Sequence, residues 1–370
     1  MIKILFLTND LGLGGVQRLV VDFANGLSKD DFEVWVGTLW VKPESFFYKD
    51  KLSPDINYVN FAFRRFFDLG GWWRLYHFIR QNKFDIVFTQ LFMADTVGRI
   101  TAWLARTPVI ITEIQNLIPD LPKKYILVDR ALAKITDICI SPVAATTDYA
   151  IKTIGFPTKK IVKLATNAVE GKRFSISVDR KKVRQGLGVP ENAPVVINVG
   201  RLVGQKGQGV LLEAAVKILK EKPDTHFLIA GSGRLEEELK QKARELNLGE
   251  RVKFLGDRKD IPELLMSSDV FAFPSLWEGQ GLILFEVFFS KLPIAASNVG
   301  GIPEVVRHET TGLLVKPGDA DDLARGILRL LNDPALAAKL ADDAYKKFKD
   351  RTMENVVKQL EDLFKKLVRR

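Results

Sequence analysis

The sequence predicts an α/β protein in which two parallel-sheet domains face each other across a cleft. The chain has 370 residues, which is more than a single hydrophobic core usually serves. Apolar, strand-like segments alternate with amphipathic, helix-like segments. The order of strand, glycine-bearing loop and helix starts a second time near residue 194. Because open parallel sheets bind ligands beyond the carboxyl ends of their strands, we expect a ligand between the two halves.

The first half opens with the run "IKILFLTN", whose unbroken apolar character is typical of a strand covered on both faces. A glycine-rich loop follows, and then a helical pattern over residues 16–27. Further strands are predicted at 32–39, 85–90, 108–114, 137–141 and 160–165, and helices near 72–82, 94–106 and 142–154.

The second half begins after a charged segment, 171–190, which three glycines and a proline punctuate. Its first strand is predicted at 194–200 and the following helix at 209–219. Further strands are predicted at 226–233, 252–257, 270–275, 292–297 and 311–317, and amphipathic helices over 320–370. The two domains are therefore expected at 1–170 and 171–349.

The composition indicates a globular protein of a reducing compartment. A single cysteine, Cys139, excludes an internal disulfide. The N-terminal apolar run is shorter than that of a signal peptide, and no apolar run reaches the length of about 20 residues that spans a membrane. We therefore expect a cytoplasmic protein. Its net charge of +10 favours anionic partners, and nucleic acid, anionic lipid and phosphorylated substrates all fit that charge.

Two glycine-bearing loops follow the first strand of each half. In "GLGGVQR" (12–18), glycines lead into a helix whose free amides suit an anion, although a tight turn alone explains them equally well. Their spacing is not the dinucleotide fingerprint, so a nicotinamide enzyme is disfavoured. In "GRLVGQKGQG" (200–209), Arg201 and Lys206 flank the turn and suit a diphosphate. The alternative is that both are solvated surface cations.

Two glutamates stand eight positions apart in "SLWEGQGLILFE" (275–286). Glu278 is predicted in the turn after a strand, and Glu286 on a largely buried helix. A buried carboxylate needs a specific partner, and a sugar or ribose hydroxyl is a suitable one. The alternative is a glutamate favoured by the helix dipole together with one held in an ion pair.

The four segments "NVGRLVGQKG", "LIAGSGRLEEEL", "FLGDRKDIPELLMSSDVFAFPSLWEGQGLILFE" and "SNVGGIPEVVRHETTGLLVKPGD" occur in this order. Together they resemble the retaining nucleotide-sugar glycosyltransferases of family 4. The resemblance covers nearly the whole chain and is strongest over 195–318. It implies the GT-B fold, with two Rossmann-like domains and a last helix, 350–370, that packs back on the first domain. It also implies retention of configuration at the transferred sugar.

The resemblance implies a role for each matching residue. Arg201 and Lys206 would hold the donor diphosphate and stabilise it as it leaves, so that no metal or other cofactor is expected. Glu278 would contact the donor sugar and Glu286 the ribose. The other donor-binding residues implied are Gly14, Gly15, Gly231, Gly233, Arg258, Gly281, Leu282 and Ile283.

The chain departs from the family pattern on the acceptor side. Family members often carry a histidine at the end of a strand such as "IITEIQN", where this chain has Gln115 beside Asn116. The frequent "NGVD" is "NAVE" at 167–170, and Gln280 replaces a frequent aromatic residue. Glutamine binds a sugar hydroxyl but cannot act as an acid or base. These changes concern the choice of donor and leave reduced activity as an alternative.

The segment 58–80 is rich in aromatic residues and arginines. Exposed, it would suit a membrane interface or a lipid-linked acceptor with a phosphate; alternatively, most of its rings belong to the core. The candidate acceptor-side residues there are Arg64, Arg65, Trp72 and Trp73.

The sequence thus predicts a metal-independent glycosyltransferase of cell-surface polysaccharide or glycolipid synthesis. Its expected partners are a nucleotide-diphosphate sugar and a glycan, lipid-linked or small-molecule acceptor, with association with an anionic membrane at its cytoplasmic face as an open alternative. A nucleotide-sugar epimerase of the same fold and a non-catalytic nucleotide-sugar-binding protein are the other readings. Nucleic-acid binding rests on charge alone and is not expected.

Overall fold

The computed structural model describes residues 1–12, 14–40, 47–117 and 121–369. The chain divides into two compact units. Unit 1 comprises Met1–Ala168 and Met353–Arg370, and unit 2 comprises Val169–Thr352. The divisions thus fall at 168/169 and 352/353, where the sequence predicted 170/171 and 349/350. No described helix is long and apolar enough to cross a membrane.

Unit 1 is built on a seven-stranded parallel sheet in the order β3-β2-β1-β4-β5-β6-β7. The inner strands are buried along nearly their whole length, as unbroken apolar runs require. The strands are β1 Ile2–Thr8, β2 Phe32–Trp40, β3 Asn57–Phe63, β4 Ile86–Thr89, β5 Val109–Glu113, β6 Ile138–Ser141 and β7 Ile161–Lys163.

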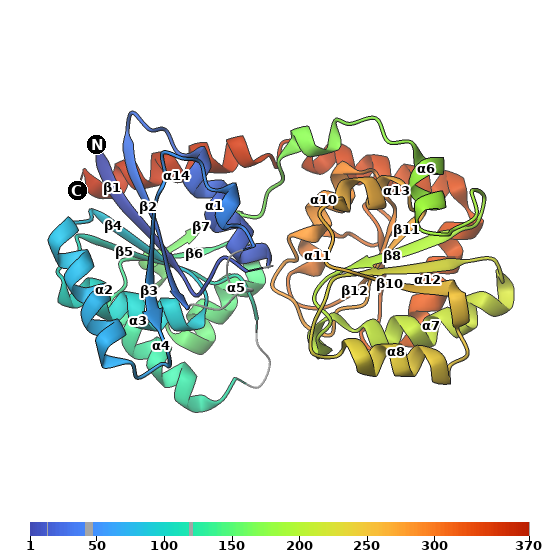
Figure 1. Cartoon of the computed structure of the whole chain (residues 1–370), viewed down its shortest axis with the longest axis horizontal. Coiled ribbons are helices and arrows are strands. Elements are labelled where there is room, and N and C mark those ends of the chain that lie inside the picture. The colour runs from blue at the N-terminus through green and yellow to red at the C-terminus, as the bar shows by residue number, and fades with distance from the viewer. Residues whose placement is uncertain (13, 41–46, 118–120, 370) are drawn as a thin grey trace. The chain divides into compact units, whose positions relative to one another are not determined.

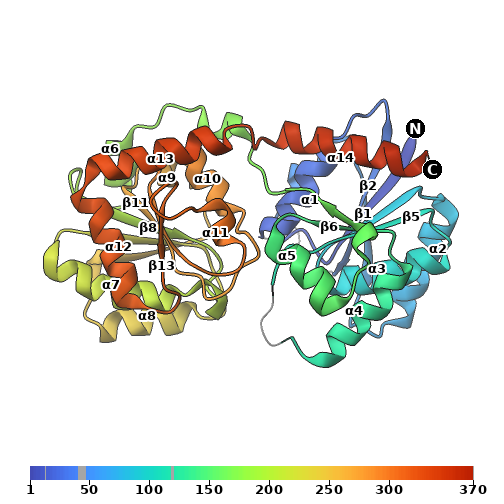
Figure 2. The same cartoon turned by 180° about the vertical axis from the view of Figure 1, so that it is seen from behind.

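Two layers of helices cover this sheet (Figures 1 and 2). The first layer holds α1 Gly15–Gly26 and α14 Met353–Val368, and the second α2 Leu69–Asn82, α3 Phe92–Leu104 and α4 Lys123–Ile135. Side chains alternate between the two faces along β1. The ring of Phe6 packs against Phe23 of α1 and Phe364 of α14, whereas Leu7 lies against Gly98 of α3. Unit 1 also contains α5 Ala144–Asp148 and the short helices η2 Lys49–Lys51, η3 Tyr149–Ile154 and η4 Thr158–Lys160.

The last helix, α14, packs on unit 1, on the same face of the sheet as α1. Its Glu361 accepts a hydrogen bond from the backbone N–H of Ser28 at 2.6 Å, and Lys365 pairs with Asp31 at 2.7 Å. Phe364 is fully buried among the rings of the first strands. The apolar face of this amphipathic helix is thereby buried against the rest of unit 1.

Unit 2 is built on a six-stranded parallel sheet in the order β10-β9-β8-β11-β12-β13. The strands are β8 Val195–Val199, β9 His226–Ala230, β10 Val252–Gly256, β11 Val270–Phe273, β12 Ile294–Ser297 and β13 Leu313–Val315. One face packs against α7 Gln208–Glu221, α8 Glu236–Glu245 and α12 Ala320–Asn332. The other packs against α9 Ile261–Met266, α10 Ile283–Phe289, α11 Ile302–Val305 and α13 Pro334–Phe348. The remaining helices are α6 Arg180–Gly186, η5 Gly171–Phe174, η6 Gly204–Lys206 and η7 Gly249–Arg251.

The helix predicted near 142–154 is present. It starts as the α-helix α5 and ends as the π-helical turn η3, where the N–H of Gly155 bonds to the carbonyl of Ala150, five residues earlier. The edge strand β3 was not predicted, since its residues are mostly half-buried and lack an unbroken apolar run. Helix α4 was also missed.

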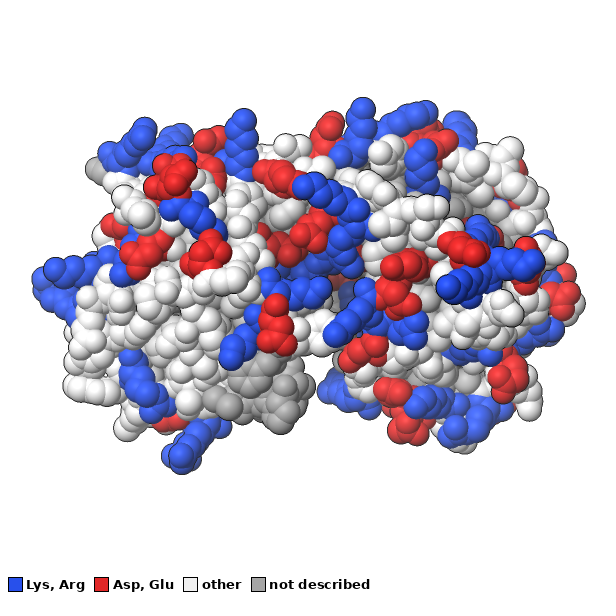
Figure 3. Space-filling view, turned by 45° about the horizontal axis from the view of Figure 1, so that its top comes forward, with Lys and Arg blue, Asp and Glu red and all other residues white. Residues whose placement is uncertain are grey.

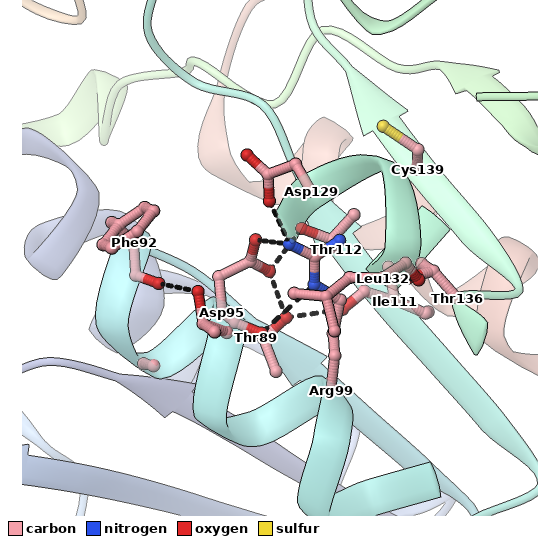
Figure 4. A network of polar contacts seen from close by, with 12 residues as sticks. Thr89, Phe92, Asp95, Arg99, Ile111, Thr112, Asp129, Leu132, Thr136 and Cys139 are labelled. Carbon is pink, nitrogen blue, oxygen red and sulfur yellow. Dashed lines mark hydrogen bonds and ion pairs between the residues drawn. The ribbon is translucent and has the colours of Figure 1, made fainter. Parts of the chain in front are cut away.

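A buried polar network joins two strand ends of unit 1 to the second helix layer (Figure 4). Asp95 Oδ1 accepts hydrogen bonds from the hydroxyls of Thr89 and Thr112 at 2.6 and 2.5 Å. Arg99, only 1% exposed, pairs with Asp95 and with Asp129 of α4 at 2.5 and 2.7 Å. Burial raises the pKa of Asp129, against the lowering effect of Arg99. Because these buried charges are paired, the network fixes α3 and α4 on the sheet.

Candidate functional site

The candidate donor-site residues of unit 2 follow the carboxyl ends of neighbouring strands. Arg201 and Lys206 come after β8, Gly231 after β9, Arg258 after β10 and Glu278 after β11. All these strands are parallel, so the loops lie along one edge of the sheet. The chain leaves β8 toward β9 on one side and later returns to β11 on the other. Such a reversal of strand order is where open α/β sheets bind ligands.

Lys206 and Glu278 form an ion pair at this edge. Lys206 Nζ lies 2.5 Å from Glu278 Oε2, and both side chains are largely buried. Ser275 Oγ makes a longer contact of 3.5 Å with the same carboxylate oxygen. The ammonium also lies 5.2 Å from the centre of the Phe273 ring. An ammonium carries three donors, so this arrangement holds a positive charge in place without using all of them.

The loop that carries Glu278 is held from both sides. The backbone carbonyl of Gln205 accepts a hydrogen bond from the backbone N–H of Leu276 at 2.8 Å. The Gln205 side-chain amide donates a hydrogen bond to the backbone carbonyl of Trp277 at 3.1 Å. Gly300 has φ +53°, and a Cβ there would stand 1.9 Å from the carbonyl oxygen of Glu278. Only glycine fits this close approach. Sequence reasoning missed Gly300, although it lies in a matched family segment as one of a glycine pair.

Arg201 is exposed and does not touch the Lys206–Glu278 pair. Among the described residues, its guanidinium makes one long contact, 3.5 Å, with Gln205 Oε1. Its backbone carbonyl accepts a hydrogen bond from Gln208 Nε2 at 3.1 Å, which fixes the loop but not the charged group. The loop after β8 therefore carries one buried, fixed cation, Lys206, and one exposed cation, Arg201.

Glu286 is buried on α10 and is partnered within the chain. Arg173 Nη1 lies 3.2 Å from Glu286 Oε1, and the arginine comes from η5, more than a hundred residues earlier. The ion-paired alternative for this glutamate is what the structure shows. No signal in the sequence pointed to Arg173. Helix α10 begins at Ile283, after the turn that carries Glu278, as the sequence predicted. Leu282 and Ile283 are half-buried there.

Arg258 is fixed by Asp260. Its Nε and Nη2 atoms reach the two carboxylate oxygens at 2.8 and 2.5 Å. The hydrogen bonds of this bidentate pair raise the pKa of Arg258 and lower that of Asp260. The pair orients the guanidinium plane beside the end of β10.

The remaining glycines of this edge let strand-end loops approach closely. A Cβ on Gly231, with φ +125°, would stand 2.2 Å from the carbonyl oxygen of Gly200. Gly233 lies similarly close to the backbone of Leu202, and Gly281 against the ring of Phe273.

On unit 1, Gly14 caps α1 and Gly15 begins it. Asp10 accepts hydrogen bonds from the N–H of Gly12 at 2.9 Å and from the Gln17 amide at 3.2 Å, which ties the loop to the first turn. Gln115 and Asn116 follow β5 and are half-buried. The first domain's candidate residues thus also lie beyond strand ends.

The aromatic segment of unit 1 divides between core and surface. The strand and helix bury Phe61, Phe63 and Leu75, whereas Phe67 and Trp73 are 76% and 64% exposed. Leu69 is also exposed. The segment is therefore neither exposed throughout nor buried throughout.

Hydrogen bonds fix the loop that presents these exposed rings. Asp68 accepts the N–H groups of Arg64 and Gly71, both at 3.0 Å, and caps α2. The Trp72 indole donates to the carbonyl of Phe66 at 2.9 Å, and Arg74 donates to the carbonyl of Phe61 at 2.8 and 3.0 Å. Arg64 and Arg65 are exposed beside the rings.

Comparisons with known proteins agree with this geometry. Residues 13–164 match "Glycosyltransferase Family 4", and residues 179–347 match "Glycosyl transferases group 1". An Escherichia coli relative, the UDP-Gal:alpha-D-GlcNAc-diphosphoundecaprenol alpha-1,3-galactosyltransferase, is 29% identical over 88% of this chain and 86% of its own length. A GDP-mannose-dependent mannosyltransferase of Corynebacterium glutamicum is 34% identical, over 47% of this chain and 48% of its own length. Several other matches likewise span about half of the relative.

Solved structures share the fold. The Anabaena protein HepE in complex with UDP-glucose superposes with a TM-score of 0.89, at 25% identity, over 99% of this chain and all of its own. WaaG, a glycosyltransferase of lipopolysaccharide biosynthesis, superposes with a TM-score of 0.79 at 15% identity over 98% of this chain and 99% of its own. The predicted arrangement of two parallel-sheet domains, the GT-B fold, is confirmed.

Proposed function

The chain belongs to the glycosyltransferases of family 4, and we propose that it transfers a sugar from a nucleotide-diphosphate sugar to a hydroxyl group with retention of configuration. The acceptor is a glycan, a lipid-linked sugar or a small molecule, and the setting is the synthesis of cell-surface polysaccharide or glycolipid. The observation that carries the proposal is the buried Lys206–Glu278 pair at the point where the strand order of unit 2 reverses.

The first step is the departure of the nucleotide diphosphate. The bond between the anomeric carbon and the diphosphate oxygen breaks, and its electron pair leaves with the diphosphate. Lys206 offers the hydrogen-bond donors that Glu278 does not use, and Arg201 adds a second, exposed cation. Fixed positive charge at the place where negative charge develops is commonly the largest contribution to catalysis.

Retention of configuration requires the acceptor oxygen to bond on the face from which the diphosphate leaves. The departing oxygen therefore lies near the incoming hydroxyl and can take its proton, so that no protein base is needed at that position. This agrees with glutamine rather than histidine at position 115. Because Lys206 and Arg201 supply the positive charge, we propose that the reaction proceeds without a metal ion.

The other candidate residues of unit 2 hold the donor. We propose that Glu286, oriented by Arg173, accepts hydrogen bonds from the ribose hydroxyls, and that Arg258 and its partner Asp260 border the base. Backbone amides at 281–283 face phosphate or sugar oxygens. UDP-sugars are the first donors to test, since HepE has been crystallised with UDP-glucose and the Escherichia coli relative is named for UDP-galactose.

Of these acceptors, we propose a sugar linked through a diphosphate to a lipid, and we propose that the protein works at the cytoplasmic face of an anionic membrane. The exposed rings, apolar in Phe67 and amphipathic in Trp73, suit insertion into a membrane interface. Arg64 and Arg65 beside them suit anionic lipid head groups. Charges of both signs are interspersed on the face shown in Figure 3, and unit 1, at the left, also has a wide uncharged area on that face.

A panel of UDP- and GDP-sugars tests the proposed function by ligand-linked thermal stabilisation. A donor at about 100 times its Kd stabilises the binding unit by about 2.7 kcal/mol. We expect one nucleotide class to raise Tm and then to be hydrolysed slowly in the absence of acceptor. A protein that neither binds nor turns over any member of the panel would contradict the proposal.

A further inference from the structure

Three neighbouring strands of unit 1 end in a row of polar residues. Thr8 closes β1, Gln90 directly follows β4, and Glu113 closes β5. The register pairs Leu7 with Thr89 and Thr89 with Thr112, so the residues one position further along stand side by side. The N–H of Gln90 donates to the carbonyl of Leu7 at 2.9 Å, which continues the ladder to the row. We call Thr8, Gln90 and Glu113 the polar row.

The polar row lies on the face of the sheet that α1 covers. Side chains alternate along a strand, and Thr8 stands two positions after Phe6, whose ring packs against α1. Thr89 and Thr112, one position before Gln90 and Glu113, point the other way, into the network of Asp95 (Figure 4). The row therefore lies on the same side as the glycine-bearing loop that leads into α1.

The two polar clusters differ in how completely they are satisfied. Glu113 accepts hydrogen bonds from the side chains of Gln90 and Thr166, one at each carboxylate oxygen. Gln90 Oε1 and Thr8 Oγ1 are buried, and neither has a partner among the described residues. Their residues are 1% and 0% exposed. Buried polar atoms of native proteins are nearly always paired with protein, water or ligand.

The chemistry of the two unpaired atoms suits a hydroxyl group. A hydroxyl donates one hydrogen bond, which the Gln90 amide oxygen accepts, and it accepts another, which the Thr8 hydroxyl donates. A phosphate oxygen has no proton to give to Gln90 Oε1 and would lie near the carboxyl of Glu113. Within the described part of the chain, Glu113 forms no ion pair that would offset such a charge.

Glu113 determines which way the Gln90 amide faces. Because the Gln90 Nε2 group is bound to Glu113, Oε1 is left as the atom of the amide that lacks a partner. Burial raises the pKa of Glu113, but either protonation state can hold the amide. Its role is positioning and not catalysis.

We propose that Thr8 and Gln90 form a subsite for one sugar hydroxyl and that Glu113 is its positioning residue. This inference rests on the proposed function, since it takes the ligand to be a sugar of either the donor or the acceptor. It adds to that function a set of residues that recognise the sugar on unit 1.

Matched variants test the subsite. Thr8→Val and Gln90→Leu remove the two unpaired polar groups while nearly keeping their shapes. Thr107→Val is the control, because its hydroxyl is also buried without a described partner but precedes β5 instead of following a strand. Thr8→Val and Thr107→Val should not lower Tm, since each removes an unsatisfied group, whereas Gln90→Leu also removes the amide bound to Glu113 and should cost some stability. Only Thr8→Val and Gln90→Leu should weaken sugar binding, by about tenfold or more, as expected where a buried site loses a hydroxyl partner.

Two probes identify the source of the hydroxyl. UDP-glucose alone reports on the donor, and N-acetylglucosamine linked through a diphosphate to a short alkyl chain reports on the acceptor in the presence of UDP. Weaker binding of either probe by titration calorimetry supports the subsite and assigns it. Unchanged affinity for both in Thr8→Val and Gln90→Leu, or a wild type that binds neither probe, would overturn it.

The positioning role has its own readout. Glu113→Gln retains an acceptor for the Gln90 amide and should keep sugar affinity within about threefold, whereas Glu113→Leu should lose it like Gln90→Leu. Equal loss in both would refute the positioning role. The binding assays need no turnover, so they separate this inference from the proposed function. If only the proposed function failed, the probes would still bind and Gln90→Leu would still weaken that binding, but no sugar transfer or donor hydrolysis would occur.

Discussion

Lys206 Nζ and Glu278 Oε2 lie 2.5 Å apart, although 72 positions separate the two residues in the chain. The side chains are only 14% and 8% exposed. They come from the loops after β8 and β11, which the parallel sheet places next to each other. The folded protein therefore holds the Lys206 ammonium in a fixed position at the candidate donor site. This costs the free energy of burying the Lys206–Glu278 ion pair.

Removing one partner of this pair should destabilise unit 2 more than removing both. Lys206→Met leaves the Glu278 carboxylate buried and uncompensated, which costs about 3 kcal/mol. The double variant Lys206→Met/Glu278→Gln should recover most of this loss, as urea unfolding would show. Lys217→Met is the control: its pair with Asp321 is exposed, so the loss should stay below about 1 kcal/mol. Equal losses in the single and double variants would contradict a buried pair.

Gly300 should be required for the position of the Glu278 loop. In Gly300→Ala, the new Cβ would stand 1.9 Å from the Glu278 carbonyl oxygen, so the loop must move. A displacement of this kind can reduce turnover about 100-fold. In Gly249→Ala, φ is similarly positive, +52°, but nothing lies within 4 Å. That variant should lose about 1 kcal/mol of stability and keep its activity. Retained turnover in Gly300→Ala would be the contrary result.

The fold could be predicted because its elements are strongly patterned. The unbroken apolar run of β1 and the glycine turns before α1 and α7 specify strand, loop and helix locally. The π-helical end of the predicted helix 142–154 could not be foreseen, since it depends on which carbonyl accepts the N–H of Gly155. Strand β3 pairs on one side only and lacks the apolar run that marks inner strands.

Glu113→Gln should stabilise the protein increasingly as pH rises. Burial raises the pKa of Glu113, so above its usual value of 4.5 the unfolded chain loses a proton that the folded protein keeps. Wild-type stability therefore falls with respect to this group as pH rises through that range, whereas glutamine cannot ionise. We expect the Tm difference between variant and wild type to be larger at pH 8 than at pH 5 by about 2 °C or more.

An exposed glutamate provides the opposite sign as a control. The hydrogen bond with Arg329 lowers the pKa of Glu309. Glu309→Gln should therefore lose a little stability at pH 8 and nothing at low pH. If Glu113→Gln showed this same sign, the carboxyl would be stabilised in its ionised form by its surroundings.

The exposed rings should carry membrane binding. The double variant Phe67→Ser/Trp73→Ser should lower partitioning onto phosphatidylglycerol vesicles about tenfold without lowering Tm, because both rings are exposed in the folded protein. Added salt should weaken wild-type binding, through Arg64 and Arg65. Ile176→Ser, at an exposed apolar residue of unit 2, is the control. Vesicle binding that is equal in all three proteins would exclude this surface as the anchor.

The candidate site could be predicted residue by residue only where a motif fixes it. Lys206 and Glu278 belong to motifs, and the parallel sheet brings them together. The partner of Glu286 could not be predicted, because Arg173 comes from a segment outside any motif. The polar row was not predicted: its residues lie within or at the ends of predicted strands, and which of their atoms lack partners depends on the packed structure.

Turnover of a nucleotide sugar tests the central claim, that the buried Lys206 stabilises the departing diphosphate. The measurement is the initial rate of UDP release from the donor that stabilises the protein, in wild type, Lys206→Met and Lys220→Met. Lys220 is exposed near the end of α7, so its variant controls for the loss of one positive charge. We expect Lys206→Met to lose a factor of about 100 to 1,000, as when one electrostatic donor is removed from a transition state, with Lys220→Met unchanged. A folded Lys206→Met protein with a rate within about threefold of wild type would contradict the claim.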